Sequence, residues 1–153
     1  MPAKSLNDAD QDFYLTKSSS DPNEREANIE FIFGNEHTSI AEITIWYSEK
    51  CDAWVIDESH AVKGWGPFIY DIAMEWATLK GDGLTCDRES VSDQARSVWK
   101  HYFDKRQDVV KIDADWLRDI GYLYFDDICL SKIYTKAPTT IGALKSANRW
   151  REN

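Results

Sequence analysis

The sequence predicts an α+β fold, in which a mixed and mostly antiparallel sheet is flanked by helices. Three apolar runs with strand character follow one another between residues 28 and 60, separated by short polar segments. Consecutive strands joined by short turns pair antiparallel. After residue 66 the apolar period lengthens from two to about 3.6 residues, which indicates a helix. We therefore expect helices to pack against a sheet that is built early in the chain.

The length of 153 residues fits one domain. We assign residues 27–153 to that domain and residues 1–26 to a polar N-terminal extension. Aromatic side chains make up 13% of the chain and hydrophobic ones 42%, so the chain can bury a core of its own. Within the extension, residues 13–15 can form a short first strand before a loop at residues 18–23.

Alternating apolar residues predict three strands, at residues 28–34, 40–47 and 53–60. The polar segment 48–52 between the last two is expected to be a hairpin turn. In the third strand, alternation predicts two faces. The first face carries Trp54, Ile56, Glu58 and His60, and the second carries Val55, Asp57 and Ser59.

The helical pattern begins at Pro67, a residue that suits the first turn because its missing N–H is not needed there. Gly81 and Gly83 end this helix, and residues 83–86 can form a brief strand. Ser90 or Ser92 is expected to cap a second amphipathic helix. The remaining predicted elements are a turn at 113–120, strands at 122–125 and 128–135, or one strand broken at 126–127, and a helix at 138–150.

Composition and charge exclude several classes of function. The net charge is -9, with 27 acidic and 18 basic residues. Because nucleic-acid binding draws its affinity from basic side chains, we expect no nucleic-acid partner. No run of about 18 apolar residues is present and the first residues lack a signal peptide, which predicts a cytoplasmic protein without a membrane contact. Cys51, Cys86 and Cys129 lack metal-ligand spacing, so we expect free thiols and no metal site.

The segment Gly64-Trp65-Gly66 is the clearest candidate for a binding site. It lies between a predicted strand and a predicted helix, and the first N–H groups of a helix have no partner inside it. Such a terminus attracts anionic groups, diphosphates in particular. Glycine allows a ligand to approach the backbone closely. The alternative is an ordinary turn that binds nothing.

The order of antiparallel strands, glycine turn, long helix, short strand, second helix and late strands resembles the GCN5-related N-acetyltransferase (GNAT) superfamily over residues 28–136. The resemblance implies the α/β three-layer arrangement of that family. It also implies acetyl-CoA as cofactor, with its pyrophosphate held by the glycine turn. Gly64 and Gly66 match the two small positions of the family's turn. Val62, Lys63 and Trp65 are the intervening residues whose N–H groups are expected to reach the phosphates, and Lys63 can add a charged contact.

Acyl transfer to an amine needs a group that accepts the amine's proton. Glu58 is the first candidate for this base and Asp57 the second, since both lie near the presumed thioester position; the alternative is a pair of solvated carboxylates. The family often has a tyrosine that returns a proton to the departing thiolate, and Trp99 stands at that position here. Tyr102 is the candidate substitute, unless it packs in the core.

Short strings also resemble small GNAT-like proteins of bacteriophages: Gly64-Trp65-Gly66-Pro67, Leu84-Thr85-Cys86-Asp87-Arg88 and Val98-Trp99. The resemblance implies a phage-encoded N-acyltransferase, acting in the host cytoplasm on an amine of a small molecule or a protein. The alternative is a catalytically inactive protein that is a virion component or an inhibitor of a host protein. Ala61, Pro67 and Trp99 favour this alternative, because each departs from what the catalytic family uses. A third hypothesis is an acidic decoy for a DNA-binding protein.

Overall fold

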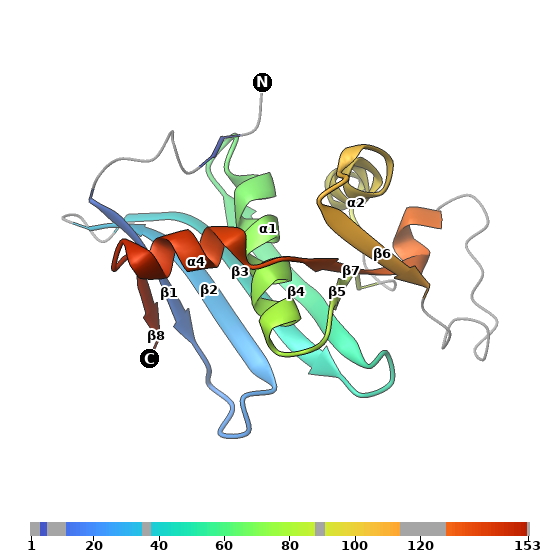
Figure 1. The fold of residues 1–153 in the computed structure, drawn as a ribbon, viewed down its shortest axis with the longest axis horizontal. Coiled ribbons are helices and arrows are strands. Elements are labelled where there is room, and N and C mark those ends of the chain that lie inside the picture. Colours follow the sequence, from blue (N-terminus) through green and yellow to red (C-terminus); the bar gives the residue numbers. More distant parts are fainter. Residues whose placement is uncertain (1–3, 6–11, 35–37, 88–90, 114–127, 153) are drawn as a thin grey trace.

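An eight-stranded sheet forms the centre of the computed structural model, which describes residues 4–5, 12–34, 38–87, 91–113 and 128–152 (Figure 1). The strand order is β6-β7-β5-β4-β3-β2-β1-β8. The strands are β1 (Phe13–Ser18), β2 (Glu26–Phe33), β3 (Thr38–Ser48), β4 (Ala53–Ala61), β5 (Leu84–Thr85), β6 (Val109–Asp113), β7 (Lys132–Lys136) and β8 (Trp150–Glu152). The helices are α1 (Gly66–Leu79), α2 (Asp93–Lys105) and α4 (Thr139–Ser146). The predicted α+β class and mostly antiparallel sheet are therefore confirmed.

Strands β1 to β4 form an antiparallel meander, as the short polar connections predict. Strand β1 lies within the segment assigned to the N-terminal extension, so the sheet begins before residue 27. Buried residues alternate with half-buried ones along β1 and β2. One face of this part of the sheet therefore packs against the core, and α1 and α4 lie over that face (Figure 1).

Strand β4 contains a bulge, which makes the predicted alternation wrong in its second half. Ile56 pairs with Ile45, but Glu58 pairs with Thr44, so Asp57 is one extra residue opposite β3. A bulge breaks the period of two and increases the local twist. Glu58 consequently lies on the face opposite that of Ile56, not on the same face.

Strand β4 pairs with β5 in parallel, through Trp54 with Leu84 and Val55 with Thr85. Strand β5 also pairs with β7, where Leu84 lies opposite Tyr134. The brief strand predicted at residues 83–86 is thus confirmed. It joins the meander to the late strands over only two residues.

Helix α1 begins and ends where the sequence predicts. Trp65 is its N-cap residue, Pro67 lies in its first turn, and Gly81 follows its end with φ +89°. Helix α2 is capped by Ser92, whose hydroxyl accepts a hydrogen bond from the N–H of Ala95 at 3.1 Å. The other predicted cap, residue 90, lies outside the described residues.

The C-terminal part differs from the prediction in three places. Residues 128–131 form a 3-10 helix, η2 (Ile128–Ser131), so only the second half of the predicted strand 128–135 is extended, as β7. Strand β6 was not predicted, and it ends at Asp113, the residue expected to begin a turn. The rest of that predicted turn lies outside the described residues, as does the strand predicted at 122–125. The last helix ends at residue 146, and Trp150 begins β8, which pairs in parallel with β1.

A buried ion pair joins α1 to β7 and α4. The carboxylate of Glu75 is fully buried, and its Oε2 lies 2.6 Å from Nζ of Lys136. Its Oε1 accepts a hydrogen bond from the N–H of Ile141 at 2.9 Å. This network places the two helices against each other on the sheet. In the part of the chain that the structure describes, no helix is long and apolar enough to cross a membrane.

Replacing Gly83 with alanine should destabilise the fold by about 1 to 3 kcal/mol, because the site is already filled. A methyl group there would lie 2.9 Å from the carbonyl oxygen of Tyr134 and closer still to Ile133. Urea denaturation measures the effect. Gly142→Ala is the control, because nothing lies within 4 Å of its added methyl group. Equal stability of the two variants would contradict the prediction.

Candidate functional site

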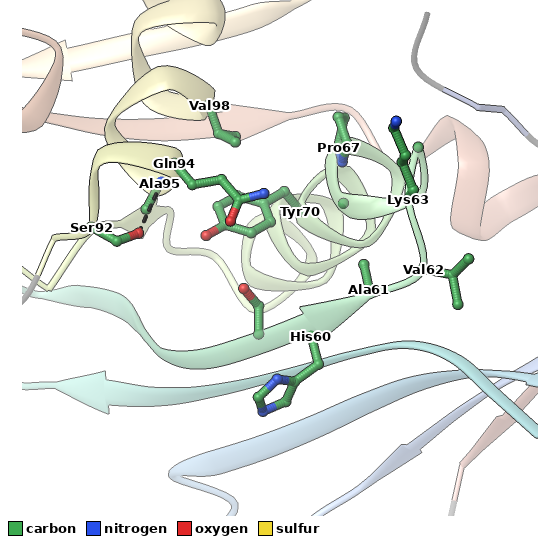
Figure 2. A pocket seen from close by; sticks show the side chains of 13 residues that line it. His60, Ala61, Val62, Lys63, Pro67, Tyr70, Ser92, Gln94, Ala95 and Val98 are labelled. Carbon is green, nitrogen blue, oxygen red and sulfur yellow. Dashed lines mark hydrogen bonds between the residues drawn. The ribbon is translucent and has the colours of Figure 1, made fainter. Parts of the chain in front are cut away.

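A groove lies between the end of β4, the start of α1 and the start of α2 (Figure 2). It consists of two adjoining cavities of about 510 and 470 Å³. The first, which we call the turn half, is lined by residues 59–64 and by the first turns of α1 and α2. The second, the strand half, is lined by residues 56–59, by Asp87 and by part of α2. Both halves share Ser59, Tyr70, Ser92 and Ala95.

The two halves of the groove differ in charge. The described residues that line the turn half include no Asp or Glu, although the chain has 27 acidic residues. They do include Lys63 and the N-terminal turns of α1 and α2, whose helix dipoles place positive potential there. The strand half carries Asp57, Glu58 and Asp87. The groove is therefore suited to an anionic group at one end and a cationic group at the other.

The glycine turn presents part of its backbone to the turn half. Gly64 has φ +93°, a left-handed conformation that glycine adopts without strain. The N–H of Val62 donates to the carbonyl of Ile40 at 2.8 Å, and the N–H of Trp65 donates to that of Val62 at 3.0 Å. Both groups thus have partners inside the protein. Of the N–H groups expected to reach phosphates, that of Lys63 is therefore better placed than these two.

Gly66 lies in the first turn of α1 and lines the turn half. No atom lies within 4 Å of the position that a Cβ would occupy there. Its N–H is among those without a partner inside the helix. The side chain of Trp65, in contrast, is buried and packs on Phe31 and Phe68. Of the five residues predicted to hold the cofactor, Trp65 alone does not line the groove.

The two candidate bases both line the strand half. Asp57 and Glu58 are exposed, and both residues belong to the lining of the strand half at the bulge in β4. The structure therefore places both residues at the groove, although the register puts Glu58 on the face of β4 opposite that of Ile56. His60, two residues further on, points away from the cavity in Figure 2.

Tyr102 does not line the groove. Its side chain is 1% exposed, and its hydroxyl donates a hydrogen bond to Asp71 at 2.5 Å. Burial, and to a lesser degree the charge of Asp71, raises the pKa of Tyr102 well above its usual value. Arg106 donates two further hydrogen bonds to Asp71, at 3.0 and 3.1 Å. This cluster attaches α2 to α1 and so sets the distance between two walls of the groove.

Tyr70 is the hydroxyl-bearing aromatic residue that the sequence analysis missed. It lies one helical turn after Gly66, and Figure 2 shows it between the end of β4 and the start of α2. It lines both halves of the groove and packs against Trp99 with ring centroids 6.0 Å apart. Burial raises the pKa of Tyr70, and hydrogen bonding to Ser59 lowers it by less. Its spacing from the glycine turn was the signal that could have found it.

Comparisons of the chain with protein-family models, with curated proteins and with solved structures find no match. The functional proposal therefore rests on the geometry of the groove.

Within the described ranges, no three side chains of His, Cys, Asp or Glu lie together in a way that could hold a metal ion. Cys51 is half-buried, whereas Cys86 and Cys129 are buried, and the thiol of Cys86 donates a hydrogen bond to the carbonyl oxygen of Leu130 at 3.6 Å.

Proposed function

We propose that the chain is an acyl-CoA-dependent N-acyltransferase of GNAT type, which transfers an acetyl group to an amine on a small molecule or a protein. The observation that carries this proposal is the division of charge in the groove. A turn half without carboxylates suits the phosphates of acetyl-CoA, and a strand half with Asp57 and Glu58 suits an amine. The order of β2 to β4, glycine turn, α1, β5, α2 and late strands supports it further. We also propose that the sheet and the helices of this chain form the three-layer arrangement of that family.

The residues of the turn half fit such a cofactor. The open space at Gly66 would admit a diphosphate close to the backbone, and Lys63 would add a charge-assisted hydrogen bond. Bound acetyl-CoA would supply an activated acetyl group. In this proposal Glu58 accepts the amine proton, directly or through a water molecule, with Asp57 as the second candidate. The hydroxyl of Tyr70, which lies where the two halves meet, donates a proton to the departing thiolate. This is the role that the sequence predicts for Tyr102.

A second candidate function is a phage protein without catalysis, which binds a host protein or serves as a virion component. Trp46 on β3 favours it, because its side chain is 41% exposed, and exposed tryptophan often anchors an interface. Trp99, at the position of the family's tyrosine, also lacks a group that donates a proton to a thiolate. In both cases the host cytoplasm or the virion is the proposed location.

Calorimetric titration of the full chain with acetyl-CoA and CoA tests the proposal. Binding at micromolar concentrations would support it and justify a screen of amine acceptors. If no heat is detected at millimolar concentrations, the acyltransferase proposal is wrong. The search would then turn to proteins that purify with the chain from infected cells or from virions.

Replacing Tyr70 with phenylalanine should lower the rate of acetyl transfer about 100-fold or more, because a positioned proton donor is lost. Binding of CoA should not change, since the ring stays in place. Steady-state kinetics with an accepted amine measure this. Tyr102→Phe is the comparison: it removes the hydrogen bond to Asp71 and should cost about 1.5 to 3 kcal/mol of stability, while the rate is retained. The reverse pattern would restore Tyr102 as the proton donor.

A further inference from the structure

Ser59 faces the body of the protein, unlike its neighbours at the end of β4. All residues from 57 to 63 are exposed except Ser59, which is half-buried. Ser59 pairs with Ile43 of β3, and the side chain of Ile43 is fully buried. Residues directly opposite each other in paired strands share a face of the sheet, and α1 packs against this face of β3 and β4. The side chain of Ser59 therefore lies on the side of α1.

The bulge in β4 turns Ser59 to this side. Strict alternation from Ile56 would place Ser59 on the opposite face, as the sequence predicts. The extra residue, Asp57, shifts the register, so that Ser59 shares the face of Ile56 instead. Bulges are frequent next to active sites, where they redirect a side chain. One consequence of this bulge is thus the position of a hydroxyl group in the groove.

Tyr70 of α1 is the residue that Ser59 meets there. Both residues line the turn half and the strand half. Tyr70 is only 6% exposed, and its ring packs against that of Trp99. Burial raises the pKa of Tyr70, and a hydrogen bond with Ser59 lowers it by less. A hydrogen bond lowers the pKa of a tyrosine when the phenolate oxygen accepts it, so Ser59 is the donor.

The other titratable groups around Tyr70 come from several elements. Cys86, which follows β5, adds to the effect of burial in raising the pKa of Tyr70. Burial and, to a lesser degree, Tyr70 raise the pKa of Tyr102 on α2. The titratable residues that line the groove are Asp57, Glu58, His60, Lys63 and Asp87. Among the described groups that shift the pKa of Tyr70, Ser59 favours the phenolate, whereas burial and Cys86 favour the neutral phenol.

We propose that Ser59 is a positioning residue, whose hydroxyl orients that of Tyr70 at the junction of the two halves of the groove. Its part in acetyl transfer rests on the proposed function. There the proton of Tyr70 passes to the departing thiolate, the phenolate accepts the hydrogen bond from Ser59, and solvent then returns a proton to it. The contact between the two hydroxyl groups needs no ligand, so it can be measured on the chain alone.

The test compares full-length Ser59→Ala with Ser39→Ala, which removes an exposed hydroxyl of β3 that does not line the groove. Each chain carries fluorotyrosine in place of tyrosine, because fluorination makes the hydroxyl ionise at lower pH. The signal that is lost in Tyr70→Phe identifies residue 70. Titration followed by fluorine NMR should show a higher pKa of Tyr70 in Ser59→Ala and an unchanged one in Ser39→Ala. Ser59→Thr keeps a hydroxyl and should also leave it unchanged.

Steady-state kinetics of the unlabelled chains test the part in acetyl transfer. With an accepted amine, Ser59→Ala should lower kcat about two- to tenfold and leave KM for acetyl-CoA unchanged, because the hydrogen bond is used when the phenolate forms. Ser59→Thr should retain the rate.

The possible results separate the inference from the proposed function. An unchanged or lower pKa of Tyr70 in Ser59→Ala would overturn the inference, and so would an equal rise in Ser39→Ala or Ser59→Thr. A higher pKa with an unchanged kcat would overturn the part of Ser59 in acetyl transfer. A higher pKa in a chain that neither binds acetyl-CoA nor transfers acetyl groups would keep the positioning of Tyr70 and refute the proposed function.

Discussion

Replacing Glu75 with alanine should lower the free energy of unfolding by about 3 to 5 kcal/mol. The change leaves the ammonium group of Lys136 nearly buried and without its partner 2.6 Å away. It also removes the acceptor for the N–H of Ile141 in the first turn of α4. Urea denaturation followed by circular dichroism measures the loss.

Two comparisons separate the buried charge from other effects. The double variant Glu75→Met/Lys136→Met should recover most of the stability, because neither charge is then left unpaired. Arg25→Ala breaks an exposed ion pair with Glu49, so it should cost less than about 1 kcal/mol. If Glu75→Ala is no more destabilising than Arg25→Ala, the buried network does not hold α1, β7 and α4 together.

Replacing Gly66 with glutamate should lower the affinity for acetyl-CoA at least about 100-fold. The added side chain has room, since nothing lies within 4 Å of the new Cβ, and Gly66 is not among the residues with positive φ. The fold should therefore tolerate it. Its carboxylate, however, would occupy the turn half and repel the phosphates at a helix terminus that otherwise attracts them. Calorimetric titration measures the change.

Gly142→Glu is the matched control for this experiment. Gly142 lies in α4, an added Cβ there also has nothing within 4 Å, and the substitution changes the net charge by the same amount. Its affinity for acetyl-CoA should equal that of the unaltered chain. If Gly66→Glu binds acetyl-CoA as well as Gly142→Glu does, the diphosphate is not bound at the glycine turn.

Elements whose signals are local could be predicted from the sequence. Strands β2 to β4 show alternation and short connections, and α1 follows a glycine turn with Pro67 in its first turn. Strand β8 could not be found in this way, because its partner β1 lies more than 130 residues away in the chain. The residues before it continue a helical pattern, so local reasoning extends α4 to Trp150.

The candidate site was predictable where it depends on residue type and not where it depends on register. Gly64 and Gly66 are recognisable from their chemistry and position. The bulge at Asp57 is one extra residue in a pair of strands, and nothing in the residues themselves shows where pairing shifts. Tyr70 and Tyr102 both belong to amphipathic patterns, so only the packing of α2 against α1 shows which of them faces the groove.

The two-residue contact between β4 and β5 divides the sheet into two parts that few backbone hydrogen bonds connect. Native-state hydrogen exchange should therefore resolve β8, β1, β2, β3 and β4 as one cooperative opening unit, and β5, β7 and β6 as another. Their amide protons should differ in protection although they share a sheet. A ligand that contacts both the end of β4 and the start of α2 would slow exchange on both sides at once.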